Sequence, residues 1–492
     1  MNGRLGDILV GRGLVSAADI EAALQRQLTE GGRLGDNLVA MGLMTPEQLA
    51  DALLTAPAVP SNLAETGVSA RTLLYLLLKF MHLQACETLL ELADRLKVPR
   101  LVTQQLLDEA VASKLVQAVG AAPGSLSLSL RYALSEAGRA AAKEALEQNL
   151  YLGPAPISLA AYQSQISRQR ISNEQLDVDA LNKGFEGLVV PDHYIRKLLP
   201  AVNAGRSVLL FGPPGNGKTT LATRIATIFK HVVYIPYAVE VGGQIIKIYD
   251  PTLHKPAVTG DSPISHARLG MEAEVFDQRF VACKRPVAVA GGEMTLDMID
   301  LQHNSETKFY DAPVHIKALN GMLLIDDFGR QKFRPDDLLN RWIIPMENQI
   351  DYLKLNTGAS FSLPFDVLLI FSTNLQPADL MDGAFLRRIQ YKIKLFSPTR
   401  EEYRRIFEGV AKSRGLTLTD EVFDFVVERL HAGEFELAYY QPRFICDQVV
   451  EACKCFGLPP KLTTELAAEA LSNLYFDMDI AEGQARYAEA AD

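Results

Sequence analysis

Residues 208–220 of this 492-residue chain have the sequence VLLFGPPGNGKTT. An apolar run precedes a glycine-rich loop, and the helix-forming sequence LATRIA continues from Leu221. The spacing fits the pattern G-x-x-x-x-G-K-[ST], in which glycines let several backbone N–H groups face one anion and the next helix adds a favourable dipole. We therefore predict a buried strand, a phosphate-binding loop and a helix that together bind a nucleoside triphosphate.

The chemistry of this loop assigns roles to its residues. Lys218 is placed to reach the β- and γ-phosphates, and the hydroxyl of Thr219 is a ligand for Mg²⁺. ATP and Mg²⁺ are therefore the expected ligands. The residues expected to contact ATP are Gly212, Pro213, Pro214, Gly215, Asn216, Gly217, Lys218, Thr219 and Thr220.

Two later apolar runs end in polar side chains suited to the same site. Residues 321–325 are followed by Asp326 and Asp327, so that one carboxylate can orient a Mg²⁺-bound water while its neighbour polarises the attacking water. Residues 365–373 lead to Asn374, whose amide can hold the lytic water or the γ-phosphate. Taken singly, such residues often only cap turns. The expected metal ligands are Thr219 and Asp326.

Taken in order, these segments resemble the AAA+ ATPases over about residues 182–476. The resemblance implies that Asn374 is the sensor 1 residue and that Arg443, in the sequence QPR, is the sensor 2 arginine. It also implies that Arg388 is the arginine finger that reaches the γ-phosphate of a neighbouring subunit, with Arg387 as its alternative. A finger that acts between subunits implies a homo-oligomeric ring, typically a hexamer.

The same resemblance implies an α/β nucleotide-binding domain over 182–396 and a C-terminal helical lid over 397–480. The gap between Lys218 and Asp326 is long, and it predicts an insertion over about 235–318 that faces the ring pore or a partner. A helix and a hairpin expected before Asn374 resemble the MoxR branch of the family, whose members remodel proteins.

One residue departs from the family pattern. Asp327 occupies a position at which most AAA+ ATPases have glutamate, and its side chain is one methylene shorter. The attacking water would have to lie closer to the backbone, or hydrolysis would be slow. A nucleotide switch with little turnover is therefore an alternative to a fast ATPase.

The composition restricts the class of protein. Hydrophobic residues make up 48% of the chain and charged residues 22%, and the net charge is −10, which argues against broad nucleic-acid binding. Five cysteines suit a reducing compartment better than a disulfide framework. We find no apolar stretch near the roughly 20 residues of a membrane span, and no signal-peptide core. We therefore expect a cytoplasmic protein.

The N-terminal segment is an internal repeat. The sequence RLGDILV at 4–10 recurs as RLGDNLV at 33–39, and each copy continues with a glycine turn and a second helical pattern. One interpretation is a helical docking module in which leucine and glycine only pack. The other is a ligand site, because an arginine beside a glycine-opened backbone suits a guanine edge or a phosphate.

This repeat resembles the MshEN domain, which binds cyclic di-GMP and precedes many type II secretion and pilus ATPases. The second copy departs from the pattern at Ala56, where a glutamine is expected. The resemblance implies a cyclic di-GMP-binding domain over 1–58, with a pilus or secretion component as one candidate client. The residues implied to bind cyclic di-GMP are Arg4, Leu5, Gly6, Asp7, Leu9, Gln27, Arg33, Leu34, Gly35, Asp36 and Leu38.

The pattern over 66–152 predicts three helices, a β-hairpin and a closing helix, an α+β arrangement that resembles the winged-helix fold. The helix that would read DNA, over 101–109, contains no basic residue and two acids, which disfavours DNA contact and favours a protein-docking role. A Gln/Ser/Arg-rich connector is expected over 153–181.

The sequence therefore predicts a multidomain protein with an N-terminal helical repeat, a winged-helix-like domain and an AAA+ core with a helical lid. We expect it to hydrolyse ATP in a ring, to remodel a protein client and to respond to cyclic di-GMP. The alternative is an ATP-dependent winged-helix transcription regulator that responds to cyclic di-GMP.

Overall fold

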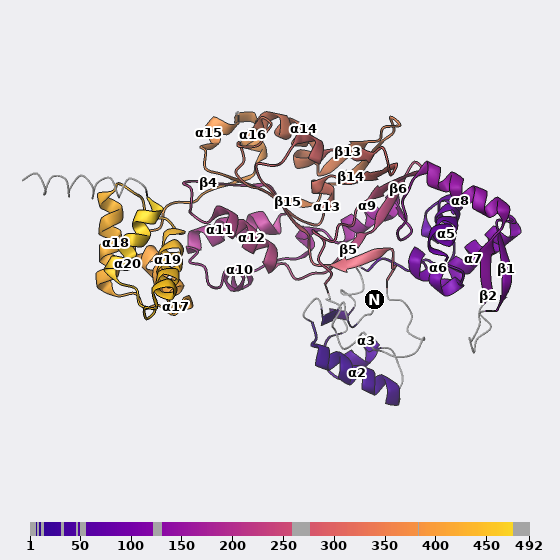
Figure 1. The fold of residues 1–492 in the computed structure, drawn as a ribbon, viewed down its shortest axis with the longest axis horizontal. Coiled ribbons are helices and arrows are strands. Elements are labelled where there is room, and N and C mark those ends of the chain that lie inside the picture. Colours follow the sequence, from indigo (N-terminus) through magenta and orange to yellow (C-terminus); the bar gives the residue numbers. More distant parts are fainter. Residues whose placement is uncertain are drawn as a thin grey trace, which may run out of the picture.

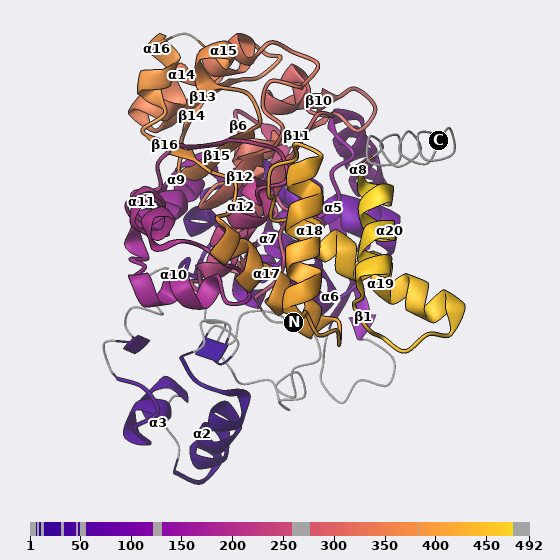
Figure 2. The same cartoon turned by 90° about the vertical axis from the view of Figure 1, so that its left-hand side faces the viewer.

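The computed structural model describes Gly6 and residues 9–10, 14–30, 34–45, 48–49, 56–121, 130–257, 276–381 and 383–475. Residues 70–148 form a helical unit at one end of the view in Figure 1, two β-sheets occupy the centre, and residues 400–474 form a second helical unit at the other end. Two N-terminal helices lie to one side of this row in both views (Figure 1, Figure 2).

The central sheet has five parallel strands in the order β16, β4, β15, β12, β9. These are β4 (Val208–Phe211), β9 (Val287–Ala290), β12 (Gly321–Ile325), β15 (Val367–Thr373) and β16 (Tyr391–Lys394). Every residue of β12 and β15 is buried, as expected for parallel strands covered on both faces. The helices that pack on one face are α10 (Val178–Gly184), α11 (Asp192–Asn203) and α12 (Lys218–Ile228). The carboxyl ends of the strands meet at one edge, where open α/β sheets bind their ligands.

A second sheet, the insertion sheet, is built largely from the segment between α12 and β12. Its strand order is β10, β11, β7, β6, β3. The strands are β3 (Ile157–Ser158), β6 (Ala238–Val241), β7 (Gln244–Lys247), β10 (Gln302–Asn304) and β11 (Phe309–Asp311). An antiparallel pair, β5 (Val233–Pro236) and β8 (Phe280–Cys283), lies in the same segment. The region expected as an insertion is thus a structured layer.

Two parts of the chain differ from the sequence expectation. Residues 287–290, expected within the insertion, form β9 of the central sheet, because their apolar side chains pair in register with β12. The insertion therefore consists of two separate segments, and strand β9 of the central sheet lies between them in the sequence. The expected connector over 153–181 is not a linker: β3 joins the insertion sheet, and α9 (Leu159–Arg168) buries Tyr162 and Ile166 in the main core.

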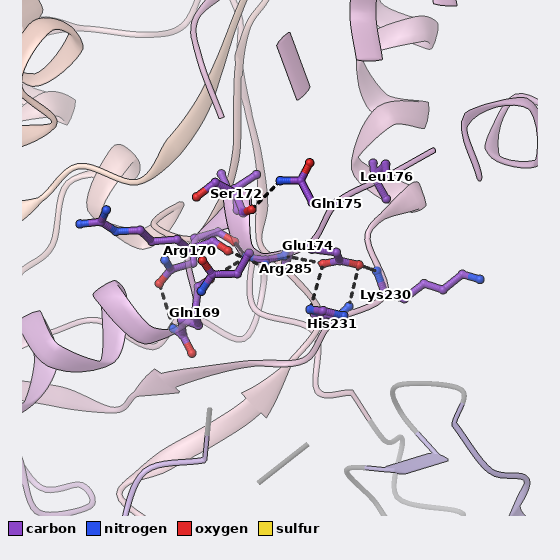
Figure 3. A network of polar contacts seen from close by, with 12 residues as sticks. Gln169, Arg170, Ser172, Glu174, Gln175, Leu176, Lys230, His231 and Arg285 are labelled. Atoms are coloured by element: carbon purple, nitrogen blue, oxygen red, sulfur yellow. Dashed lines mark hydrogen bonds and ion pairs between the residues drawn. The ribbon is translucent and has the colours of Figure 1, made fainter. Parts of the chain in front are cut away.

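Buried polar contacts hold the segment after α9 in place (Figure 3). The guanidinium of Arg285, two residues before β9, donates to Glu174 at 3.1 Å and to the carbonyl of Gln169 at 3.0 Å. Glu174 also accepts the backbone N–H groups of Lys230 and His231. Both charged side chains are nearly inaccessible, and each is paired, as burial of a charge requires.

The middle unit (residues 66–152) contains the predicted order of helices and strands. Its elements are α5 (Ala70–Gln84), α6 (Leu89–Leu96), α7 (Arg100–Ala112), β1 (Val116–Ala121), β2 (Leu130–Leu134) and α8 (Glu136–Gln148). Its core includes Ala238 and Ile245 of the insertion sheet. Arg279, which is also buried, donates to the carbonyls of Thr66 at 2.8 Å and Pro156 at 3.1 Å. The middle unit and the insertion sheet therefore share a core.

The remaining elements form smaller units. Beside the central sheet lie α13 (Val314–Lys317), α14 (Pro335–Asn348), β13 (Ile350–Lys354), β14 (Ser360–Pro364), α15 (Pro377–Leu380) and α16 (Gly383–Arg388). The helical lid (residues 400–474) has its own core and consists of α17 (Arg400–Ser413), α18 (Asp420–Ala432), α19 (Gln441–Phe456) and α20 (Thr464–Leu474). The N-terminal helices are α2 (Ala17–Glu30) and α3 (Leu34–Ala40).

Candidate nucleotide-binding site

A cleft of about 750 Å³ opens at the carboxyl edge of the central sheet, between the sheet and the helical lid. Its walls are the loop between β4 and α12, the ends of β12 and β15, the segment 187–191, and residues of α17 and α19. This volume is in the range of small-molecule sites. Segments that are far apart in the sequence therefore line one cleft.

The loop after β4 has the strained backbone that its glycines predict. Gly212 has a φ of 142°, and a Cβ there would lie 2.1 Å from the carbonyl oxygen of Leu395, so only glycine fits. Lys218 is buried, and its Nζ donates to the carbonyls of Gly212 at 2.9 Å and Pro213 at 2.8 Å. Burial lowers the pKa of Lys218, and the negative charges of the two strand-end aspartates partly offset this effect.

The rest of the loop lies along the cleft. The expected ATP contacts that line it are Pro214, Gly215, Asn216, Gly217, Lys218, Thr219 and Thr220. The side chain of Asn216 is buried and donates to Ser397 Oγ at 3.4 Å, which connects the loop to the segment that enters the lid.

The hydroxyl of Thr219 donates to Oδ2 of Asp326 over 2.7 Å. These two residues are separated by 107 positions and lie on different elements, the start of α12 and the end of β12. A hydroxyl and a carboxylate side by side form an oxygen donor set of the kind that Mg²⁺ prefers. The expected metal ligands therefore lie together and fit the ion in chemistry.

Asp327 and Asn374 lie side by side in the cleft. Nδ2 of Asn374 lies 3.5 Å from Oδ1 of Asp327, and both residues line the cleft. Asp327 is exposed and has a left-handed backbone, with φ at 48°. The side chains expected to act on water thus lie at adjacent strand ends.

The three expected arginines occupy two different places. Arg443 lines the cleft from α19, with its side chain 73% exposed and 3.7 Å from Asp447. Arg388 lies on α16, where its Nε is 2.6 Å from Oε1 of Glu347. Arg387 is exposed on the same helix, and its Nε donates to the carbonyl of Gly383 at 3.2 Å. Neither of the paired arginines lines the cleft of its own chain.

Sequence reasoning missed several residues of the cleft. Tyr440 packs on Gly215, and Tyr439 and Arg405 of the lid also line the cleft. The apolar segment 187–191 lines another wall. No sequence pattern indicates the contact of Tyr440 with the loop, because that contact depends on the position of the lid.

The expected cyclic di-GMP residues lie only partly within the described residues. Leu9 and Leu38 are fully buried in a cluster with Ile20, which is a packing role. The residues on helical segments of this unit are Gly6, Gln27, Leu34, Gly35 and Asp36. The residues outside the described part of the chain are Arg4, Leu5, Asp7 and Arg33.

Comparison with known proteins gives one family match, over part of the chain, and several distant matches among solved structures. Residues 399–473 match the family described as "Domain of unknown function (DUF8689)". This match covers the helical lid. No curated protein matches the sequence.

Solved structures of similar fold include a mutant of Thermotoga maritima RuvB, at 15% identity and a TM-score of 0.33, covering 62% of this chain and 73% of that chain. NtrX from Brucella abortus in complex with ADP matches at 14% identity and a TM-score of 0.35, over 58% of this chain and 56% of that one. Domain III of the Thermotoga maritima replication initiation protein DnaA matches at 14% identity and a TM-score of 0.33. The match covers 59% of this chain and 95% of that chain. The function proposed below rests on the geometry of the site.

Within the described part of the chain, no helix combines the length and the apolar character of a membrane span.

Proposed function

We propose that the protein is an AAA+ ATPase that hydrolyses ATP within a homo-oligomeric ring, typically a hexamer. The main support is the 2.7 Å contact between Thr219 and Asp326, which joins a phosphate-binding loop to a strand-end carboxylate inside one cleft. The helical lid beside the cleft, with Arg443 facing into it, fits the same assignment.

In this proposal the backbone N–H groups of the loop hold the phosphates, and Lys218 exchanges its two carbonyl partners for phosphate oxygens. Thr219 and Asp326 would hold Mg²⁺, which supplies charge neutralisation on the phosphates. Asp327 accepts a hydrogen bond from the attacking water, and Asn374 orients that water against the γ-phosphate. Arg443 contacts the nucleotide from the lid.

The positions of Arg387 and Arg388 support the proposal of a ring. Arg388 lies on α16 outside the cleft of its own chain, so it can reach a γ-phosphate only in another subunit. Glu347 neutralises this arginine within the chain. We assign Arg388 as the finger, with Arg387 as its alternative.

We further propose that the ring remodels a protein client and that cyclic di-GMP regulates it through residues 1–58. The support is the duplicated Arg-Leu-Gly sequence, whose two copies begin at Arg4 and Arg33. Transcription regulation is less favoured, because α7 exposes Leu101, Asp108 and Glu109 and its sequence has a single basic residue, Arg100 at its first position, which is few for phosphate contacts. A pilus or secretion component is a candidate client.

The deciding experiment is a steady-state ATPase assay of the full chain. The wild-type chain is expected to release phosphate, and Lys218→Ala is expected to abolish release; Lys230→Ala, an exposed lysine just beyond α12, is the matched control. ATP binding without turnover by the wild type would instead indicate a nucleotide switch.

Calorimetry of the full chain with cyclic di-GMP separately tests the proposed binding of this ligand to residues 1–58. Binding should survive Lys218→Ala and be lost in the double variant Arg4→Ala, Arg33→Ala. Unchanged affinity in the double variant would exclude the proposed site.

A further inference from the structure

The turn after β12, residues 326–329, has an unusual backbone. Asp327 adopts a left-handed conformation, with φ at 48°, which costs most side chains about 1–2 kcal/mol. Aspartate and asparagine adopt this conformation several-fold more often than other non-glycine residues. The shorter acid at this position therefore matches the backbone that the turn requires.

Both neighbouring strands hold this turn through backbone groups. The N–H of Asp326 donates to the carbonyl of Ala290, the last residue of β9, at 2.8 Å. The N–H of Phe328 donates to Ser372 of β15 at 2.7 Å, and its carbonyl accepts from Thr373 Oγ1 at 2.8 Å. These bonds fix the middle of the turn, but they leave the carbonyl of Asp326 and the N–H of Gly329 to be satisfied.

Gln331 satisfies both groups with one side chain. Its Nε2 donates to the carbonyl of Asp326 at 2.9 Å and to that of Asp327 at 3.3 Å. Its Oε1 accepts the N–H of Gly329 at 2.9 Å. The amide also lies 3.5 Å from the carbonyl of Gly291, beyond the neighbouring strand β9. A half-buried side chain thus bonds to the backbone on both sides of Asp327.

We propose that Gln331 is a positioning residue for ATP hydrolysis: it holds the left-handed turn that directs the carboxylate of Asp327 toward the attacking water. With this left-handed backbone Asp327 lines the cleft, and its Oδ1 lies 3.5 Å from Nδ2 of Asn374. In this proposal the left-handed backbone of Asp327 brings its carboxylate to the attacking water, a task for which glutamate would use its additional methylene. This proposal rests on the proposed ATPase function.

The first test compares Gln331→Leu with Gln302→Leu by steady-state kinetics. Gln302 is an exposed glutamine whose amide likewise donates to a backbone carbonyl, that of Asp297, at 3.2 Å. Gln331→Leu is expected to lower kcat at least tenfold while KM for ATP and affinity for fluorescent ADP change less than twofold. Gln302→Leu is expected to leave both unchanged. Unchanged kcat in Gln331→Leu, or a loss of ADP affinity in parallel with kcat, would overturn the proposal.

The second test replaces Asp327 itself. Asp327→Glu supplies the side chain that most of the resembled family uses, yet it is expected to lower kcat, because glutamate is disfavoured in the left-handed turn. Turnover equal to or faster than that of the wild type would overturn the proposal.

A double-mutant cycle separates positioning from general destabilisation. In the Asp327→Asn background, which keeps a side chain suited to the turn but removes the carboxylate, Gln331→Leu should lower the residual kcat no further. Multiplicative effects would indicate a role that does not pass through Asp327. If Lys218→Ala hydrolyses ATP normally, the assignment of hydrolysis to this cleft fails, which distinguishes that outcome from failure of the positioning role alone.

Discussion

The ring of Tyr440 lies directly on the α-carbon of Gly215, so closely that a Cβ at Gly215 would lie 2.2 Å from Cδ1 of the ring. Tyr440 comes from the helical lid, and Gly215 comes from the phosphate-binding loop. The hydroxyl of Tyr440 lies 3.0 Å from that of Tyr475, which in turn stacks on Phe435 at 3.7 Å. The lid therefore touches the loop through an aromatic group that is anchored in its own core.

We expect Gly215→Ala to destabilise the chain more than Gly217→Ala. Both glycines have left-handed backbones, with φ at 75° and 74°, so alanine costs about 1–2 kcal/mol at either position. Only Gly215 adds a collision with Tyr440, since nothing lies within 4 Å of a Cβ at Gly217. Overpacking of this kind adds about 1–3 kcal/mol. Denaturant unfolding of the variants measures the difference.

The double variant Gly215→Ala, Tyr440→Ala provides the control for this contact. It should recover the excess over Gly217→Ala, because the collision is removed while the backbone strain remains. Equal destabilisation by the two single changes would show that the lid moves away from the loop at no cost.

Arg388→Ala is expected to lower kcat by about 10³-fold, the lower range for an arginine finger, with little change in ADP affinity. Arg387→Ala should have a smaller effect. Mixing Arg388→Ala subunits with Lys218→Ala subunits should restore activity, because one variant keeps an intact cleft and the other supplies the arginine. A mixture that stays inactive would contradict action between subunits.

Asp351→Asn is expected to destabilise the nucleotide-binding core by about 3–5 kcal/mol at neutral pH, the usual cost of breaking a buried ion pair. The Asp351 carboxylate is fully buried; His315 Nε2 and Arg341 Nη1 each lie 2.7 Å from its oxygens. Asp300→Asn is the matched control: Asp300 pairs with the same arginine at 3.1 Å but is 65% exposed, so about 1 kcal/mol or less is expected. Similar losses in both variants would contradict this account.

The same aspartate predicts a pH dependence. Burial raises the pKa of Asp351, but hydrogen bonds from His315 and Arg341 lower it further, so that its pKa lies below the ordinary value. A carboxylate with a lowered pKa contributes stability above the unfolded-state value of about 3.9 and loses it as the pH falls through the folded value. The difference between wild type and Asp351→Asn should therefore shrink below about pH 4. The fluorescence of Trp342, the sole tryptophan, can follow unfolding at each pH, because its ring lies 5.6 Å from that of His315.

Local motifs predicted the parts of the site that depend on short stretches of sequence. The loop from Gly212, the strand-end acid Asp326 and the amide of Asn374 each follow an apolar run, and parallel strands deliver their ends to one edge. The structure places these residues around one cleft. The roles of the individual side chains in hydrolysis remain predictions.

Residues whose role depends on tertiary contacts could not be found in this way. Residues 287–290 have the same short apolar sequence whether they lie in an insertion or in the central sheet, and only pairing with β12 distinguishes the two. Gln331 is an ordinary polar residue in a charged loop until the backbone groups around it are placed. Tyr440 acquires its contact only through the position of the lid.

The core shared by the middle unit and the insertion sheet bears on where the chain can be divided. A fragment beginning at residue 153 or 182, the boundaries that the sequence suggests, would expose Ala238 and Ile245 to water and leave Arg279 without its carbonyl partner at Thr66. The smallest fragment that keeps this shared core intact therefore begins before Thr66. Any displacement of the middle unit is then transmitted to the insertion sheet directly, through the side chains of this shared core.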